Sequence, residues 1–184
     1  MNNKKIMIVL AIVFILPVAL AKLALELDWF NRAATNKGEL LEPVLDATPL
    51  YSKTKPPTIW RLVYVIPEQC DQSCKNAIYS IHQVWLALGR ESDRVQALLI
   101  TTEQSDPTIN NDIKQLDNIH QLQTSTQNIQ NVFKQSSADG IFVVDTLQNI
   151  ILRYGLQQQK QKAVMHSRDI LADVKKLLKL SRIG

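Results

Sequence analysis

The feature that most constrains the fold is an alternation of short apolar runs with an amphipathic segment, beginning at Ile59. Residues 59–66 (IWRLVYVI) are rich in β-branched and aromatic residues and are predicted to form a buried strand, and residues 94–101 (RVQALLIT) are predicted to form a second strand. Between them, residues 74–88 place apolar side chains at three- and four-residue steps, which predicts a helix that stops at Gly89. This order favours two parallel strands joined by a helical crossover.

A second helix is predicted after the second strand. Asp106 is typical of an N-cap and Pro107 of a first helical turn, and the apolar spacing continues to Ile119 or His120. A further short helical turn is predicted over residues 128–135, whose apolar side chains lie three and four apart. Together these segments would form the connection to the last strands.

The end of the chain completes a mixed α/β pattern. Residues 141–145 and 149–154 are apolar runs separated by three residues, which predicts an antiparallel hairpin. The polar stretch 157–162 is predicted to be a solvated loop, and residues 168–180 to be the last helix. A central mixed sheet with helices on both faces satisfies this order, which is the thioredoxin-like architecture.

An uncharged apolar segment lies near the N-terminus. Residues 6–21 would span roughly 24 Å as a helix, and extension through Leu27 gives about 33 Å, enough for a bilayer core of roughly 30 Å. Lys4 and Lys5 precede the run, so the positive-inside rule places the N-terminus in the cytoplasm. We therefore predict a single-pass inner-membrane anchor and an exported, periplasmic body. A cleaved signal peptide is the alternative, because Ala19-Leu20-Ala21 forms an A-x-A site.

Three parts follow from these patterns. We assign residues 1–27 to a cytoplasmic tip and transmembrane anchor, 28–57 to a tether, and 58–184 to the thioredoxin-like domain. The tether prediction rests on four prolines and the lack of a sustained period, although residues 39–45 could add a short helix or an edge strand.

The distribution of charge argues against a nucleic-acid partner. The chain has a formal net charge of +4, but the two lysines before the apolar run and the tail 168–182 supply more than all of it. Residues 6–167 therefore sum to −1, which is a poor electrostatic footprint for nucleic acid.

The two cysteines, Cys70 and Cys74, lie between the first strand and the first helix. At this spacing they are within reach of a disulfide if the first turn adapts. A helix N-terminus presents free N–H groups that stabilise a thiolate, so Cys70, expected to be the more exposed, should be the more reactive. Thiolates perform disulfide exchange and also bind Cu(I). A purely structural disulfide and two unrelated thiols are the alternatives.

With these features the chain resembles the Sco/SenC family of cytochrome c oxidase assembly proteins. The resemblance rests on the strand Trp60–Pro67, the cysteine pair, the order of elements and the anchor. The segments 86–90, 144–154 and 177–184 are also similar to small membrane proteins encoded among cytochrome c oxidase assembly genes in proteobacteria. The family implies a thiol–disulfide oxidoreductase or Cu(I) chaperone whose partner is an oxidase subunit or assembly factor. A non-catalytic scaffolding subunit with an inert Cys70–Cys74 pair is the competing prediction.

The chain departs from this family at the third copper ligand. In Sco proteins a distant histidine just before the late hairpin joins the two cysteines, and residues 136–140 contain no histidine here. His166, predicted to lie in the loop before the last helix, is the substitute ligand that we consider, beside Cys70 and Cys74. The chain also has no proline before Ile141, where thioredoxins place a cis-proline facing the thiols.

Overall fold

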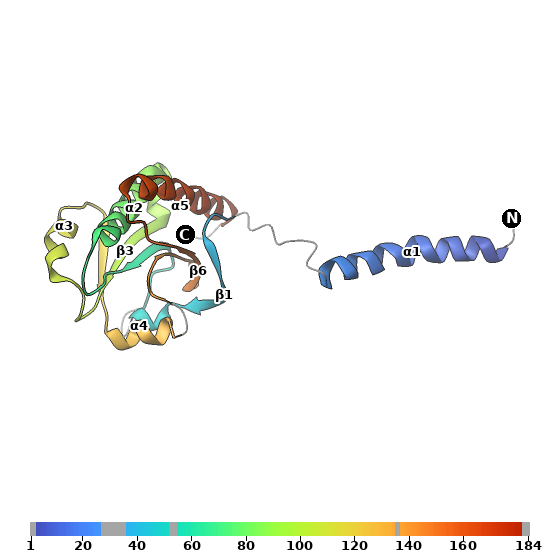
Figure 1. The fold of residues 1–184 in the computed structure, drawn as a ribbon, viewed down its shortest axis with the longest axis horizontal. Helices are drawn as coiled ribbons and strands as arrows, with labels where there is room; N and C mark the ends of the chain where they lie inside the picture. The colour runs from blue at the N-terminus through green and yellow to red at the C-terminus, as the bar shows by residue number, and fades with distance from the viewer. Residues whose placement is uncertain (1–2, 27–35, 52–54, 135–136, 182–184) are drawn as a thin grey trace. The chain divides into compact units, whose positions relative to one another are not determined.

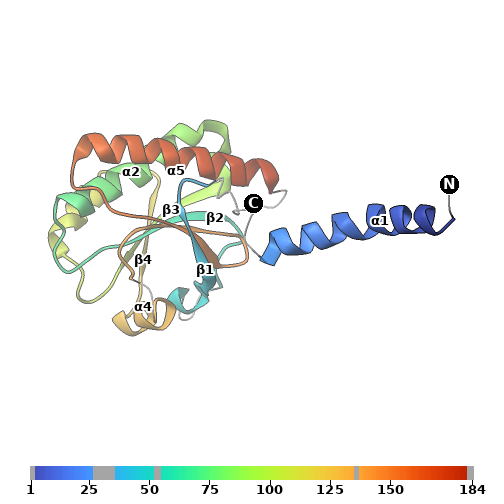
Figure 2. The same cartoon turned by 45° about the vertical axis from the view of Figure 1, so that its right-hand side comes forward.

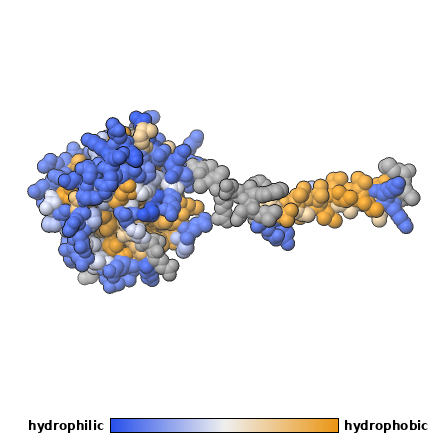
Figure 3. All heavy atoms as spheres, viewed as in Figure 1, coloured by the Kyte–Doolittle hydropathy of each residue, from blue (hydrophilic) through white to orange (hydrophobic). Residues whose placement is uncertain are grey.

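The computed structural model describes residues 3–26, 36–51, 55–134 and 137–181. The chain divides into two compact units, residues 1–35 and residues 36–184. In the first unit, helix α1 (Asn3–Glu26) is apolar along most of its length (Figure 3). Its segment Lys4–Ala24 is long and apolar enough to cross a membrane. The predicted end of the anchor, Leu27, lies outside the described residues.

The second unit contains a mixed sheet of six strands within the described residues. The strands are β1 (Glu39–Asp46), β2 (Trp60–Val65), β3 (Val95–Thr101), β4 (Ile119–Gln123), β5 (Ile141–Val144) and β6 (Asn149–Tyr154). They lie in the order β1-β6-β5-β2-β3-β4. Strands β2, β3 and β4 are parallel, whereas β5, β6 and β1 are joined by antiparallel pairings, and β5 pairs antiparallel with β2. The predicted parallel crossover and the predicted hairpin are both confirmed.

Helices cover both faces of this sheet, which confirms the thioredoxin-like fold (Figures 1 and 2). The helical elements of this unit are η1 (Thr48–Tyr51), α2 (Gln72–Leu88), η2 (Gly89–Arg94), η3 (Pro107–Ile109), α3 (Asn110–Lys114), α4 (Thr126–Val132) and α5 (Lys160–Leu180). Helices α2 and α5 pack side by side on one face, and α4 and η1 cover the other. Strand residues alternate between the two cores: Leu62 and Tyr64 face α2 and α5, whereas Val63 faces the α4 side.

Part of the predicted tether belongs to the sheet. Strand β1 pairs antiparallel with β6, with Glu39 opposite Arg153 and Asp46 opposite Asn149. The boundary at residue 57 is therefore wrong, and the edge-strand reading of residues 39–45 is the one that the structure confirms. The strand signal of this run is weak, because Pro43 interrupts it and only Leu41 is buried among its apolar residues.

Two predicted helices differ from the observed bounds by more than one turn. The helix that starts after Asp106 ends at Lys114 instead of His120, and Asn118, with a positive φ of 64°, lies in the turn that leads into strand β4. His120 therefore lies on an edge strand. Helix α5 starts at Lys160, eight residues before its predicted start at Arg168, so part of the predicted loop 157–162 is helical. Its buried stripe begins at Ala163.

Candidate functional site

The two cysteines form a disulfide where the chain leaves β2 and enters α2. Their Cα atoms are 5.2 Å apart. Cys74, in the first turn of α2, is 0% exposed, whereas Cys70 is partly exposed. The order of exposure predicted from the sequence is therefore confirmed, and an incoming sulfur can meet Cys70 before Cys74.

Asp71, between the cysteines, caps helix α2. Its Oδ1 accepts hydrogen bonds from the backbone N–H groups of Ser73 (2.9 Å) and Cys74 (3.0 Å) and from the Ser73 hydroxyl (2.6 Å). These hydrogen bonds, together with one that the Gln158 side chain donates to Oδ2, lower the pKa of Asp71 to about 2, and the bonds from the Ser73 hydroxyl and Gln158 contribute most. The carboxylate is therefore charged at neutral pH. We expected free N–H groups beside the sulfur atoms, but two of these groups are already bound to a carboxylate.

A second carboxylate holds Cys70 from the loop after β3. Asp106 accepts the backbone N–H of Cys70 on Oδ2 at 2.9 Å, and its own N–H donates to the Pro67 carbonyl at 2.9 Å. Its Oδ1 caps η3 by accepting from the Thr108 N–H and hydroxyl. The Thr108 hydroxyl, followed by the Cys70 N–H, lowers the pKa of Asp106. The loop that carries Cys70 is thus tied on one side to α2 and on the other to the loop after β3.

The segment just before helix α5 closes the site from a third direction. Asn76 of α2 donates from Nδ2 to the carbonyls of Gln157 (2.8 Å) and Gln158 (2.9 Å). Gln158 returns a hydrogen bond from Nε2 to Asp71 Oδ2 at 2.7 Å. Sequence reasoning missed Gln158, which it assigned to a solvated loop, and it interpreted Asp106 only as a helix cap. In neither case does the sequence carry a signal for the long-range contact.

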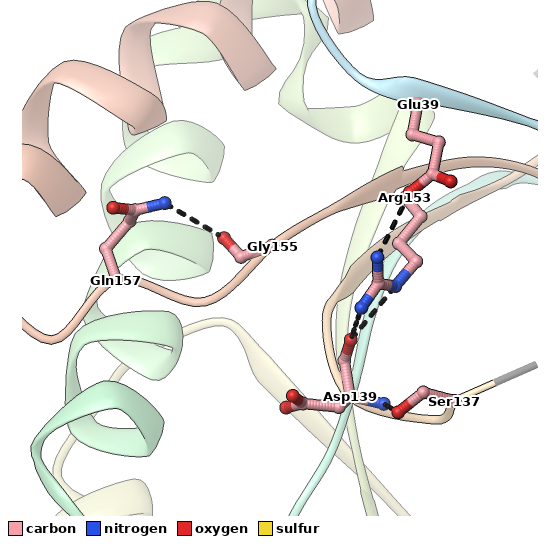
Figure 4. A network of polar contacts seen from close by, with 6 residues as sticks. All are labelled: Glu39, Ser137, Asp139, Arg153, Gly155 and Gln157. Carbon is pink, nitrogen blue, oxygen red and sulfur yellow. Dashed lines mark hydrogen bonds and ion pairs between the residues drawn. The ribbon is translucent and has the colours of Figure 1, made fainter.

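The loop before β5 lies at the same end of the sheet as the disulfide, because Ile141 pairs with Tyr64 near the end of β2. Figure 4 shows how Arg153 of β6 holds this loop. Its Nε and Nη2 donate to the Asp139 carbonyl (3.0 and 2.7 Å), and its Nη1 meets Glu39 of β1 at 3.0 Å. A proline does not precede Ile141. Gly140 has a φ of 154°, and a Cβ there would lie 3.0 Å from the Tyr154 carbonyl oxygen.

His166 was predicted to lie in the loop before the last helix, but it lies within helix α5. Its ring packs edge-on against Tyr154, with 5.6 Å between the ring centroids, and burial lowers its pKa. Among the described residues, no group of three or more His, Cys, Asp or Glu side chains could hold a metal ion. The site that the structure assembles is therefore a sulfur pair with two carboxylates beside it.

Comparisons with known proteins agree with this fold. A family model described as a transmembrane-like, thioredoxin-like, C-terminal domain matches residues 60–181. No curated protein matches the chain. The solution structure of apo Sco1 from Thermus thermophilus is 16% identical, with a TM-score of 0.51, covering 78% of this chain and 97% of that one.

Two further solved structures are similar at lower scores. A domain of a possible thiol-disulfide isomerase from Cytophaga hutchinsonii is 17% identical over 79% of this chain and 95% of that one, with a TM-score of 0.44. Copper-bound yeast Sco1 is 14% identical over 75% of this chain and 92% of that one, with a TM-score of 0.48. At these identities the Thermus structure supports the fold, and the other two add no argument.

Proposed function

Because the chain belongs to the transmembrane-like, thioredoxin-like C-terminal domain family, we propose that it performs thiol–disulfide exchange through Cys70 and Cys74. The observation that carries this proposal is the disulfide at the mouth of the β2–α2 corner, with Cys70 partly exposed and Cys74 fully buried. A protein that needed the bridge only for stability would gain little from it, because a bridge between residues four apart closes a small loop.

The roles of the two sulfur atoms follow from their exposure. In the reduced protein, the Cys70 thiolate attacks a partner disulfide, forms a mixed disulfide and releases one partner sulfur. Cys74, four residues away on the first turn of α2, then attacks the Cys70 sulfur and releases the second. Two electrons pass to the partner, and the two protons of the dithiol finish on the partner thiols.

The site of action is proposed from the N-terminal segment. Helix α1 would hold the protein in the inner membrane as a single-pass anchor, with Lys4 and Lys5 in the cytoplasm and the thioredoxin-like domain in the periplasm. Disulfide chemistry suits that compartment. The resemblance to Sco/SenC proteins supports a partner in cytochrome c oxidase biogenesis, either an oxidase subunit or an assembly factor. The anchor, instead of a cleaved signal peptide, is part of this proposal.

The midpoint reduction potential of the Cys70–Cys74 pair distinguishes exchange from a scaffolding role. We expect the full chain in detergent, equilibrated in thiol–disulfide buffers and alkylated, to give a midpoint less negative than about −300 mV, because structural disulfides lie below that value. A midpoint well below it would contradict the proposal and favour a non-catalytic subunit with an inert bridge.

Cu(I) handling by the reduced pair is a second prediction, with the metal as cargo. Two thiolates suit this soft ion, and no third ligand is needed for a two-coordinate site. In an anaerobic titration, we expect Cys70→Ser to bind one equivalent of Cu(I) fewer per chain than the wild type. The His166→Ala variant should bind as much Cu(I) as the wild type. Equal stoichiometry in Cys70→Ser and the wild type would contradict copper handling and leave exchange unaffected.

A further inference from the structure

We propose that Asp71 and Asp106 set the redox poise of the Cys70–Cys74 pair and make the protein an electron donor. The proposal rests on the exchange function proposed above. Both carboxylates bind the backbone around the two cysteines, one from each side of the loop that carries Cys70. The spacing of the two cysteines in the sequence assigns no role to either carboxylate.

The first argument concerns the N–H groups at the start of α2. In a dithiol site at a helix N-terminus, such groups stabilise the anionic sulfur, which favours the reduced form and makes the disulfide a strong oxidant. Here the N–H groups of Ser73 and Cys74 donate to Asp71 at 2.9 and 3.0 Å. The carboxylate therefore takes the donors that the sulfur would use, and its charge offsets the positive end of the helix dipole.

The second argument concerns the charge around Cys70. Asp106 Oδ2 accepts the Cys70 N–H at 2.9 Å, so a second negative charge is fixed against the backbone of Cys70. Asp106 is held in turn by Thr108, which bonds its other oxygen at 2.6 Å. Lys75 is the cation that acts on Asp106. With two carboxylates and one ammonium group, the balance of charge disfavours an anionic sulfur on Cys70.

The direction of electron flow follows. A reduced form without anion stabilisation is readily oxidised, so the disulfide is the favoured product and the dithiol gives its two electrons to a partner disulfide. The partner disulfide is reduced to two thiols while Cys70 and Cys74 become a disulfide. An upstream protein dithiol must then re-reduce the bridge, itself becoming a disulfide, before the next cycle.

Charge and capping can be separated by substitution of Asp71. Asn is as good an N-cap as Asp and removes the charge together with the oxygen that accepts from Gln158, whereas Ala also frees the N–H groups of Ser73 and Cys74. Asp106→Asn removes the second charge and leaves one acceptor oxygen, for either the Cys70 N–H or Thr108. Asp46→Asn is the matched control, because Asp46 accepts the N–H of Thr48 at 2.8 Å beyond the opposite end of the sheet.

The measurement is the equilibrium constant of the full chain with the glutathione redox couple, with folding checked by circular dichroism. We expect Asp71→Ala to favour the reduced form about tenfold, or ~30 mV, and Asp71→Asn and Asp106→Asn about threefold each. Asp46→Asn should match the wild type. If the pair equilibrates with glutathione and all variants agree within error, this inference is wrong while the exchange function stands. If no buffer reduces the wild-type pair, both fail.

Discussion

Replacement of Asp173 by Ala is expected to lower the free energy of unfolding by about 3–5 kcal/mol. Asp173 is a buried carboxylate of helix α5, 3% exposed. Its Oδ2 accepts the backbone N–H groups of Lys37 (2.7 Å) and Gly38 (2.9 Å) and the hydroxyl of Tyr154 (2.8 Å). The Ala variant would leave these donors without an acceptor in a closed space, because the Tyr154 ring already lies against Gly38.

Asp169→Ala is the control for this prediction. Asp169 lies one turn earlier on the same helix and is partly exposed, so its loss should change stability by no more than about 0.5 kcal/mol. Urea unfolding of the full chain in detergent, followed by circular dichroism, measures both. Asp173→Ala should also expose Lys37 to trypsin, because the segment before β1 loses its attachment. Equal stabilities for the two variants would show that Asp173 does not hold the start of β1.

The central elements of the fold could be predicted because their residues carry strong local signals. Strands β2 and β3 are mostly apolar runs buried on both faces, and α2 has an apolar stripe ended by Gly89. The hairpin β5–β6 follows from two such runs with a short connection. In each of these elements, the types of consecutive residues indicate which side chains are buried. The element can therefore be predicted without knowledge of distant contacts.

The two edge strands could not be predicted in the same way. Strand β1 contains Pro43 and is held by β6 and, at its start, by Asp173 from a helix far along the chain. Strand β4 is polar, with Ile119 and Leu122 only partly buried, and its local pattern continues that of the preceding helix. An edge strand pairs on one side only, so its sequence carries less of the apolar signal. Their places depend on long-range contacts.

The position of the two cysteines in the candidate site could be predicted from the sequence, whereas the carboxylates that surround them could not. The position of Cys70 and Cys74 between a strand and a helix is visible in the sequence, and the structure joins them as a disulfide. The hydrogen bonds of Asp71 depend on the cap geometry, and the contact of Asp106 with Cys70 spans 36 residues. These contacts change the expected electrostatics, because they replace free N–H groups with bound carboxylates.

Cys70→Ser is expected to abolish exchange, which is the largest functional effect in this account. The remaining sulfur, Cys74, is fully buried, so it reacts only after local opening of the β2–α2 corner. An opening cost of about 3 kcal/mol would slow its reaction with glutathione disulfide by roughly a hundredfold relative to Cys70 in Cys74→Ser. Stopped alkylation assays on the reduced full chain measure both rates. Comparable rates for the two variants would contradict the assignment of Cys70 as the attacking sulfur.

Capture of a partner by Cys74→Ser in native membranes tests the central claim most directly. With the resolving sulfur removed, the attack by Cys70 stops at the mixed disulfide, which non-reducing gels resolve as a covalent complex. We predict a complex that disappears on reduction with dithiothreitol, is absent from Cys70→Ser membranes and contains an oxidase subunit or assembly factor. If Cys74→Ser captures no more protein than Cys70→Ser, the cysteine pair does not perform thiol–disulfide exchange and the account is wrong.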